Sequence, residues 1–126
     1  MSNTEPKPSE FRLSKDKKTL GVTFDNGEHV EFSAEFLRVQ SPSAEVQGHS
    51  ESQRQTVPGK REVLITGVAP VGNYEVRIDF SDFHKSGIYS WSYFRTLAAE
   101  REALWARYLK ELEEKGLSRE IPDIRH

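Results

Sequence analysis

The sequence contains no cysteine among its 126 residues. This absence excludes disulfides, cysteine-based zinc and iron–sulfur sites, and cysteine nucleophiles. The chain also has no apolar run near the ~20 residues that a membrane-spanning helix needs. Its start, "MSNTEPKPSE", lacks the apolar core of a signal peptide. We therefore expect a cytoplasmic protein that does not enter a membrane.

An excess of charge of one sign is lacking as well. The chain has 18 Lys and Arg against 20 Asp and Glu, a formal net charge of -2, and both signs are interspersed. Such a balance gives no reason to expect a nucleic-acid partner. Hydrophobic residues make up only 35% of the chain. They cluster along the sequence, which favours one small folded domain with polar ends.

The polar ends and one internal stretch limit that domain. Residues 1–9 are predicted to be a disordered tail, residues 10–116 a single domain and residues 117–126 a flexible tail. Inside the domain lies "SPSAEVQGHSESQRQTVPGK", residues 41–60. Its second half lacks apolar periodicity, and we expect residues 50–58 to be mobile.

Two segments predict β-hairpins. In "LGVTFDNGEHVEF" the apolar residues alternate on both sides of Asn26-Gly27, which is the strongest short hairpin signal. A short strand over residues 11–13 is expected beside it. The second hairpin joins "REVLITGV" to "NYEVRIDF", with Pro70 and Gly72-Asn73 as the connection.

Two helices are predicted from capping residues and apolar spacing. Ser33 is expected to cap a short helix over residues 34–39. A longer helix is expected to begin after Ser90, bend near Thr96 and end at Gly116. Its wide apolar stripe predicts packing across one face of a sheet. The fold class is therefore α+β, a small antiparallel sheet built from hairpins with short helices and a C-terminal helix packed on it.

No complete catalytic constellation is visible. His49 begins "HSE", half of a non-haem iron facial triad, but such sites need a second distant histidine and a larger barrel. The "PGK" at residues 58–60 is not a phosphate loop. We expect a protein that is not an enzyme and that carries no cofactor.

The most distinctive segment is "FSDFHKSGIYSWSYF", residues 80–94. One interpretation is a set of core aromatics with a satisfied histidine. The other is an aromatic-rimmed binding surface with His84 at its centre. Tyr89 and His84 fall outside the helical phase of Trp91 and Phe94, so they are the predicted exposed members of that surface.

The segments "LRVQSPSAEVQGH", "PVGNYEVRIDFSDFHKSGIYSW" and "ALWARYLKEL" resemble the gamma-butyrobetaine hydroxylase-like N-terminal domain family. The resemblance covers roughly residues 10–115 and is to the bacterial stand-alone members. It implies no established activity. In larger proteins the same domain precedes the oxygenase barrel of carnitine-pathway hydroxylases or is fused to iron–sulfur carrier ATPases of the Mrp type.

The resemblance also implies a position for a metal. In the hydroxylases a C-P-C-x-x-C motif and a later histidine hold zinc. The cysteine positions correspond here to Ser41, Ser43 and Val46, and the histidine to His84. Serine hydroxyls are poor zinc ligands and valine is none. Ser41-Pro42 instead predicts an N-cap and first position of a short helix.

Two functional hypotheses follow. The first is a non-catalytic protein-binding or adaptor domain whose partner is a protein, with a link to iron–sulfur or metal homeostasis suggested by the fusions. In the second, His49 and His84 hold iron or zinc with Glu45, as an accessory to a 2-oxoglutarate-type oxygenase. The predicted binding residues are His84, Tyr89, His49 and Glu45.

Overall fold

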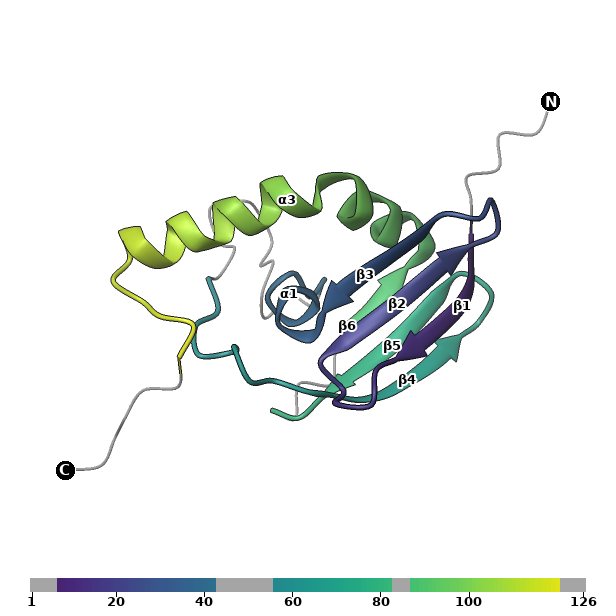
Figure 1. Ribbon diagram of the computed structural model, residues 1–126, viewed down its shortest axis with the longest axis horizontal. Helices are drawn as coiled ribbons and strands as arrows, with labels where there is room; N and C mark the ends of the chain where they lie inside the picture. Colours follow the sequence, from purple (N-terminus) through teal and green to yellow (C-terminus); the bar gives the residue numbers. More distant parts are fainter. Residues whose placement is uncertain (1–6, 43–55, 83–86, 121–126) are drawn as a thin grey trace.

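The computed structural model describes residues 7–42, 56–82 and 87–120 of the chain (Figure 1). In chain order the described elements are β1 (Pro8–Leu13), β2 (Thr19–Phe24), β3 (His29–Ser33), α1 (Ala34–Val39), β4 (Ile65–Val71), β5 (Glu75–Phe80), β6 (Gly87–Ser90) and α3 (Trp91–Glu114). The predicted α+β class is confirmed. No helix in the described part of the chain combines the length and apolar character needed to cross a membrane.

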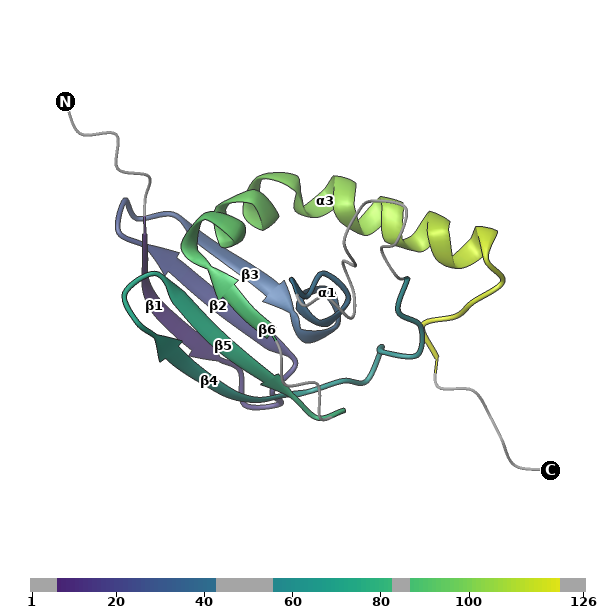
Figure 2. The same ribbon diagram turned by 180° about the vertical axis from the view of Figure 1, so that it is seen from behind.

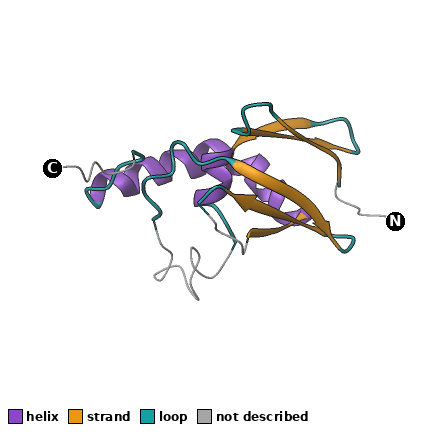
Figure 3. Cartoon of the chain, turned by 90° about the horizontal axis from the view of Figure 1, so that it is seen from below, coloured by secondary structure: helices purple, strands orange, loops and turns teal. Residues whose placement is uncertain are grey.

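The described strands form two antiparallel sheets in the orders β1-β2-β3 and β4-β5-β6. Seen from below, the two sheets lie one above the other, and the long helix begins between them and extends beyond them on one side (Figure 3). Opposite views agree that α1 lies beneath the middle of α3, at the end of β3 (Figures 1 and 2). This arrangement gives α1 neighbours on several sides.

The first predicted hairpin is confirmed. Asn26 and Gly27 connect β2 to β3. Gly27 has a φ of 93°, a conformation in which a residue with a side chain would be strained. Leu20 pairs with Phe32, so the apolar residues of both strands share one face. The strand expected at residues 11–13 is also present as part of β1, which pairs with β2.

The second hairpin is present, but its first strand is shifted along the chain, since β4 spans Ile65–Val71 rather than residues 61–68. Gly72 makes the connection with a φ of 63°, as expected. Pro70, however, lies inside β4 opposite Val76 rather than in the turn. Among the described residues β4 is an edge strand of its sheet, and an edge tolerates a residue without an N–H.

The N-caps predicted at Ser33 and Ser90 are confirmed. The Ser33 hydroxyl accepts a hydrogen bond from the Phe36 amide at 2.9 Å, and the Ser90 hydroxyl accepts one from the Tyr93 amide at 3.1 Å. Past the C-terminus of α3, Gly116 adopts a φ of 67°, which matches the predicted stop.

The bend of α3 lies at Glu100 and not at Thr96. Glu100 has non-helical dihedral angles, φ -113° and ψ 15°. Before the bend, Phe94 and Leu97 are buried in the main core, whereas Tyr108, beyond it, packs with Val39 of α1 in a separate cluster. The bend therefore turns the helix from the sheets onto α1.

Strand β6 was not predicted. Its four residues, Gly87–Ser90, lie within the segment 80–94, where the sequence analysis placed no strand after residue 80. Gly87 allows the close pairing, because a Cβ at this position would lie 3.0 Å from the Tyr89 ring and 3.1 Å from the Ile78 carbonyl oxygen. A strand this short carries too little periodicity to be recognised from its sequence.

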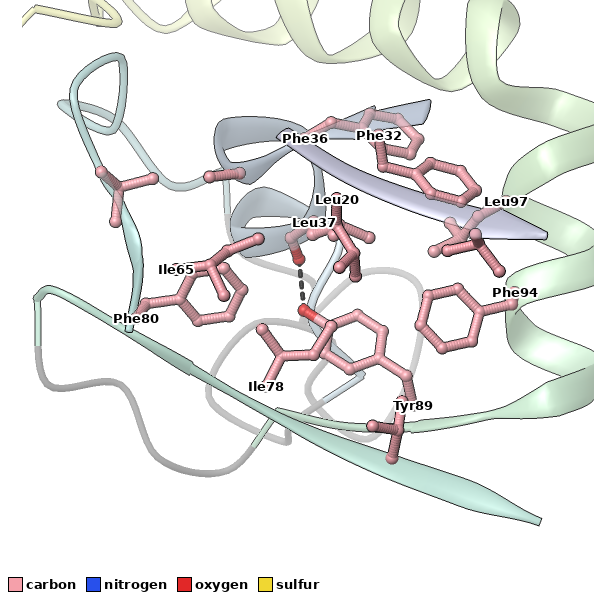
Figure 4. Close-up of a cluster of buried hydrophobic side chains, with 14 of the residues drawn as sticks. Leu20, Phe32, Phe36, Leu37, Ile65, Ile78, Phe80, Tyr89, Phe94 and Leu97 are labelled. Carbon is pink, nitrogen blue, oxygen red and sulfur yellow. Dashed lines mark hydrogen bonds between the residues drawn. The ribbon is translucent and has the colours of Figure 1, made fainter. Parts of the chain in front are cut away.

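The main core is formed by both sheets, α1 and the first half of α3 (Figure 4). Its largest fully buried side chains are Tyr89, Phe24, Phe32, Phe94, Leu20, Leu37, Ile65, Ile78, Leu97, Val22 and Val76. Most of these residues fall on the alternating or helical apolar positions that the sequence predicts.

Tyr89 was predicted to be exposed, and this prediction is wrong. Its side chain is fully buried, and its hydroxyl donates a hydrogen bond of 2.5 Å to the Leu37 carbonyl oxygen (Figure 4). Alternation along β6 explains the difference, since Ile88 points outward with 41% of its surface exposed. Tyr93 adds a similar bond to the Gln40 carbonyl oxygen. The two tyrosines thus satisfy carbonyls at the end of α1.

Parts of the predicted mobile segments are bound to the domain. In the segment 117–120, the Ser118 carbonyl accepts from the Gly59 amide at 2.8 Å. Thr56, expected in a mobile loop, is buried and accepts a hydrogen bond from Lys115 Nζ at 2.8 Å. Backbone and side-chain partners from distant parts of the chain hold these residues, and local composition does not reveal such partners. Residues 1–6, 50–55 and 121–126 of the predicted mobile segments lie outside the described residues.

We predict that Tyr89→Phe destabilises the domain by about 1–3 kcal/mol, because it leaves the buried Leu37 carbonyl without its donor. Urea unfolding at neutral pH measures this loss. Tyr74→Phe is the matched control, since Tyr74 is 66% exposed, and it should change stability by less than about 0.5 kcal/mol. Equal effects of the two variants would contradict the role given to Tyr89.

Buried phenols also predict a loss of stability at high pH. Burial raises the pKa of Tyr89 far above its ordinary 10.0, and burial together with the nearby Glu35 charge raises the pKa of Tyr108 to about 12. Above about pH 10 the unfolded chain releases these protons while the folded chain retains them. Stability is therefore complete below pH 10 and falls above it, by at most about 1.4 kcal/mol per pH unit for each tyrosine.

Urea unfolding between pH 8 and about pH 11 checks this dependence. The Tyr89→Phe and Tyr108→Phe variants should each show a shallower decline than the unmodified chain, whereas Tyr74→Phe should not. Lysines titrate in the same range, so the difference between variants is the informative quantity.

Candidate functional site

A groove runs between the β3–α1 segment and the second half of α3. It has a volume of about 440 Å³. Its lining residues are Glu31, Ser33, Phe36, Arg101, Glu102, Trp105, Ala106 and Leu109. We call it the α1–α3 groove.

The walls of the α1–α3 groove are apolar and rigidly supported. Phe36 stacks on Phe32 with ring centroids 6.0 Å apart, and it meets Trp105 at 6.4 Å. Trp105 and Leu109 are four residues apart on α3, so they lie one above the other on the same face of the helix. Leu109 is 39% exposed, which leaves a large aliphatic side chain open to solvent along one wall.

Carboxylates surround this apolar surface. Glu31 and Glu102 belong to the lining, and Glu113 follows Leu109 by one helical turn. In residues 7–42, 56–82 and 87–120, neither Glu102 nor Glu113 forms an ion pair. The Arg101 guanidinium donates to the Glu31 backbone carbonyl oxygen. The lining therefore carries two carboxylates against one guanidinium, an acidic excess of one charge beside apolar walls.

The Arg119 side chain contacts both α1 and α3 beside the groove. Its Nε and Nη2 donate to the two carboxylate oxygens of Glu35 at 2.8 and 2.7 Å. Its guanidinium carbon lies 5.1 Å from the centroid of the Trp105 ring. Since Trp105 also lines the groove, the arginine contact and the groove share one wall.

A second charged cluster lies at the other end of α1. Arg38 Nε and Lys60 Nζ approach the same Asp82 oxygen, Oδ2, at 2.7 and 2.6 Å. Arg38 Nη1 is buried and has no hydrogen-bond acceptor among the residues that the structure describes. The cluster ties α1 to the end of β5, and sequence spacing gave no sign of it because its members come from three separate segments.

The other predicted site residues cannot be placed. His49, His84 and Glu45 lie outside the described residues, so their roles in binding or metal coordination stay predictions. Tyr89, the fourth predicted binding residue, is a core side chain. The short helix predicted to begin at Ser41-Pro42 likewise extends beyond the described residues.

The first position of the implied zinc motif does not fit the metal. Ser41 is fully buried, and its side chain hydrogen-bonds with Tyr89. It offers a neutral hydroxyl already engaged with a protein group, where zinc needs a thiolate or imidazole. Within residues 7–42, 56–82 and 87–120, no three His, Asp or Glu side chains gather closely enough to hold a metal ion.

Sequence reasoning missed the α1–α3 groove. We expected the whole apolar stripe of α3, including Trp105 and Leu109, to cover a sheet. The width of that stripe could have indicated the groove, because the stripe is wider than the apolar face of a helix that packs on a single sheet. The bend at Glu100 decides which part remains uncovered.

Comparisons with known proteins agree with this architecture. The sequence model of the family described as gamma-butyrobetaine hydroxylase-like, N-terminal, matches residues 11–95. No curated protein matches the chain. The match ends before Trp105, so the α3 wall of the groove lies beyond it.

Three solved structures are similar over most of their length. Two solution NMR structures share 40% and 37% identity, cover 98% and 100% of this chain and 98% and 97% of their own, and give TM-scores of 0.80 and 0.79. A crystal structure from Acidithiobacillus ferrooxidans, a protein of unknown function in the DUF971 family, is 35% identical. It covers 77% of this chain and 100% of its own, with a TM-score of 0.64. The chain belongs to the gamma-butyrobetaine hydroxylase-like N-terminal domain family.

Proposed function

We propose that this domain is a non-catalytic, cytoplasmic protein-binding module. Its α1–α3 groove receives an apolar side chain of a partner protein, flanked by basic residues. The observation that carries this proposal is the exposed Leu109 beside Trp105 and Phe36, with carboxylates at the rim. Exposed aliphatic surface rimmed by polar groups is typical of interaction sites.

The size and composition of the groove suit a protein anchor. A volume of about 440 Å³ accommodates a few side chains. Aromatic walls that are already packed, as the Phe36 and Trp105 rings are, lose little side-chain entropy when a partner binds. A partner leucine or phenylalanine would bury the exposed part of Leu109 and gain about 1.5–3 kcal/mol.

Charge complementarity specifies the flanks of the partner. Glu102 and Glu31 line the groove, and Glu113 lies about three helical turns beyond Glu102, one turn past Leu109. A basic segment would meet this excess of negative charge, whereas an acidic one would be repelled. Rim charges of this kind govern association rate and specificity more than affinity.

Among the described residues, the side chains of Thr23, His29 and Glu31 follow one another as in a catalytic triad, and their setting favours a structural role. Thr23 Oγ1 lies 2.9 Å from His29 Nδ1, and His29 Nε2 lies 3.5 Å from a Glu31 oxygen. His29 and Glu31 are about half exposed or more on an open strand surface. Water competes there with any substrate, and a nucleophile needs positioned donors for the developing charge.

The biological context of the partner stays a prediction. A link to iron–sulfur or metal homeostasis rests on the fusions seen in the family, which is an analogy. The alternative, a metal held by His49 and His84 with Glu45 as an accessory to an oxygenase, depends on residues outside the described ranges.

The first test selects peptides from a displayed random library on the unmodified domain. We predict selected sequences with an apolar residue flanked by Lys or Arg. Their binding should weaken by about tenfold or more in Leu109→Ser, which removes an apolar contact. Glu102→Lys should also weaken them, because it reverses a rim charge.

Leu117→Ser is the matched control, since Leu117 is 38% exposed, much like Leu109, and does not line the groove. It should leave peptide binding unchanged. Fluorescence of the peptide gives the affinity, and thermal unfolding confirms that both variants fold. Selected peptides that are acidic, or that bind Leu109→Ser as well as the unmodified domain, would exclude the groove as the binding site.

A separate prediction concerns metal. We expect the untagged domain to contain well under one equivalent of zinc or iron and to keep its cooperative thermal transition in a chelator. The reason is that Ser41, Ser43 and Val46 occupy the ligand positions of the zinc-binding relatives, and structural zinc supplies folding energy outright. Elemental analysis and a melting curve measure both quantities. A transition that collapses in chelator would favour the metal-binding alternative.

A further inference from the structure

We infer that Glu35 and Trp105 form a guanidinium-recognition site beside the α1–α3 groove, occupied here by Arg119 of the same chain. The partner of the groove supplies an arginine that replaces the Arg119 side chain. This inference rests on the proposed function and specifies the chemistry of the partner.

The geometry is that of arginine recognition. Both oxygens of Glu35 accept from the guanidinium, at 2.8 and 2.7 Å, and the indole ring of Trp105 faces the same group at 5.1 Å. A planar fork satisfies a carboxylate bidentately and stacks on an aromatic ring at the same time. A lysine ammonium cannot reproduce this combination, so the site discriminates between the two cations.

The buried Glu35 carboxylate requires a cationic partner. It is only 5% exposed, in the first turn of α1, and a buried carboxylate needs a charged partner. The N-terminal end of α1 and its Ser33 cap fix the position of Glu35 before any ligand arrives. Loss of Arg119 would leave a preformed acceptor beside an aromatic face.

Arg119 can leave the site without unfolding the segment that carries it. Its backbone carbonyl accepts from the Arg61 amide at 3.0 Å, and the adjacent Ser118 carbonyl accepts from Gly59. These bonds do not involve the guanidinium, and the Arg119 side chain is 30% exposed. Rotation about its side-chain bonds is therefore sufficient to open the site.

The shared Trp105 wall couples this site to the groove. A free arginine competes poorly with Arg119, because an intramolecular group has a high effective concentration. A segment that also places an apolar residue against Leu109 gains a second contact and can overcome that competition. The selected partner is therefore a segment with an apolar residue and an arginine about one helical turn apart.

Chemical rescue tests the recognition site directly. The probes are N-acetyl-arginine amide and N-acetyl-lysine amide at equal millimolar concentrations, with melting temperature as the readout. We expect Arg119→Ala to melt below the unmodified domain and to regain stability with the arginine probe more than with the lysine probe. The double variant Glu35→Gln/Arg119→Ala should show no such difference, which controls for general solvent effects. Equal responses to the two probes would overturn the inference.

If Arg119→Ala does not fold, Arg119→Lys serves instead, since it retains a cation near Glu35. The indole N–H resonance of Trp105 then reports binding, and it should shift with the arginine probe and not with the lysine probe. An indole resonance that responds to neither probe, or to both alike, would also overturn the inference.

A peptide experiment separates this inference from the proposed function. The probe is an alanine–glutamine dodecapeptide with one leucine and one arginine a helical turn apart, compared with its arginine-to-lysine analogue. We expect Arg119→Ala to bind the arginine peptide roughly tenfold more tightly than the unmodified domain, because the internal competitor is gone. The lysine analogue should gain less.

The outcomes are distinguishable. Binding that depends on Leu109 but is indifferent to Arg119 and to the arginine overturns the guanidinium site and leaves the groove function standing. Binding that depends on neither Leu109 nor Glu102 overturns the proposed function. An arginine preference that persists after Glu35→Gln would place recognition elsewhere and overturn the inference.

Discussion

The hydrogen bond from the buried Tyr89 hydroxyl to the Leu37 carbonyl determines where α1 lies, and the rest of the site depends on α1. This helix has six residues and cannot be stable alone, because so short a helix gains too few internal bonds to offset nucleation. It is held by a serine cap at its start and by tyrosine hydroxyls at its end. Every one of its residues is buried, so it is positioned entirely by its neighbours.

From this position the short helix contributes side chains to the main core, to the α1–α3 groove and to the ion pair with Arg119. Leu37 enters the main core, Phe36 forms the floor of the α1–α3 groove, and Glu35 receives Arg119. Arg38 reaches Asp82 at the end of β5. Buried ion pairs of this kind stabilise a fold little against well-packed apolar groups, but they are strongly destabilising when one partner is lost. We interpret the two pairs on α1 as specifying its orientation.

The bend in α3 decides which apolar surface remains open. The first half of the helix completes the core with Phe94 and Leu97, and the second half packs on α1 through Tyr108. A straight helix cannot follow both surfaces, so the stripe leaves the sheets at the bend. Trp105 is only partly covered, and Leu109 is 39% exposed. The apolar stripe of α3 is wider than the surface that the domain buries, and the uncovered part is available to a partner.

The sequence by itself determined the local elements and the family. The Asn26-Gly27 turn, the two serine caps and the strand alternation are governed by neighbours along the chain, so their physics can be read from short segments. Sequence also placed a candidate site at residues 80–94, but it could not orient Tyr89, because its direction depends on the pairing of the unpredicted β6 with β5. Only the tertiary structure decided the groove and the Glu35–Arg119 contact, since these residues are 84 positions apart and meet through packing alone.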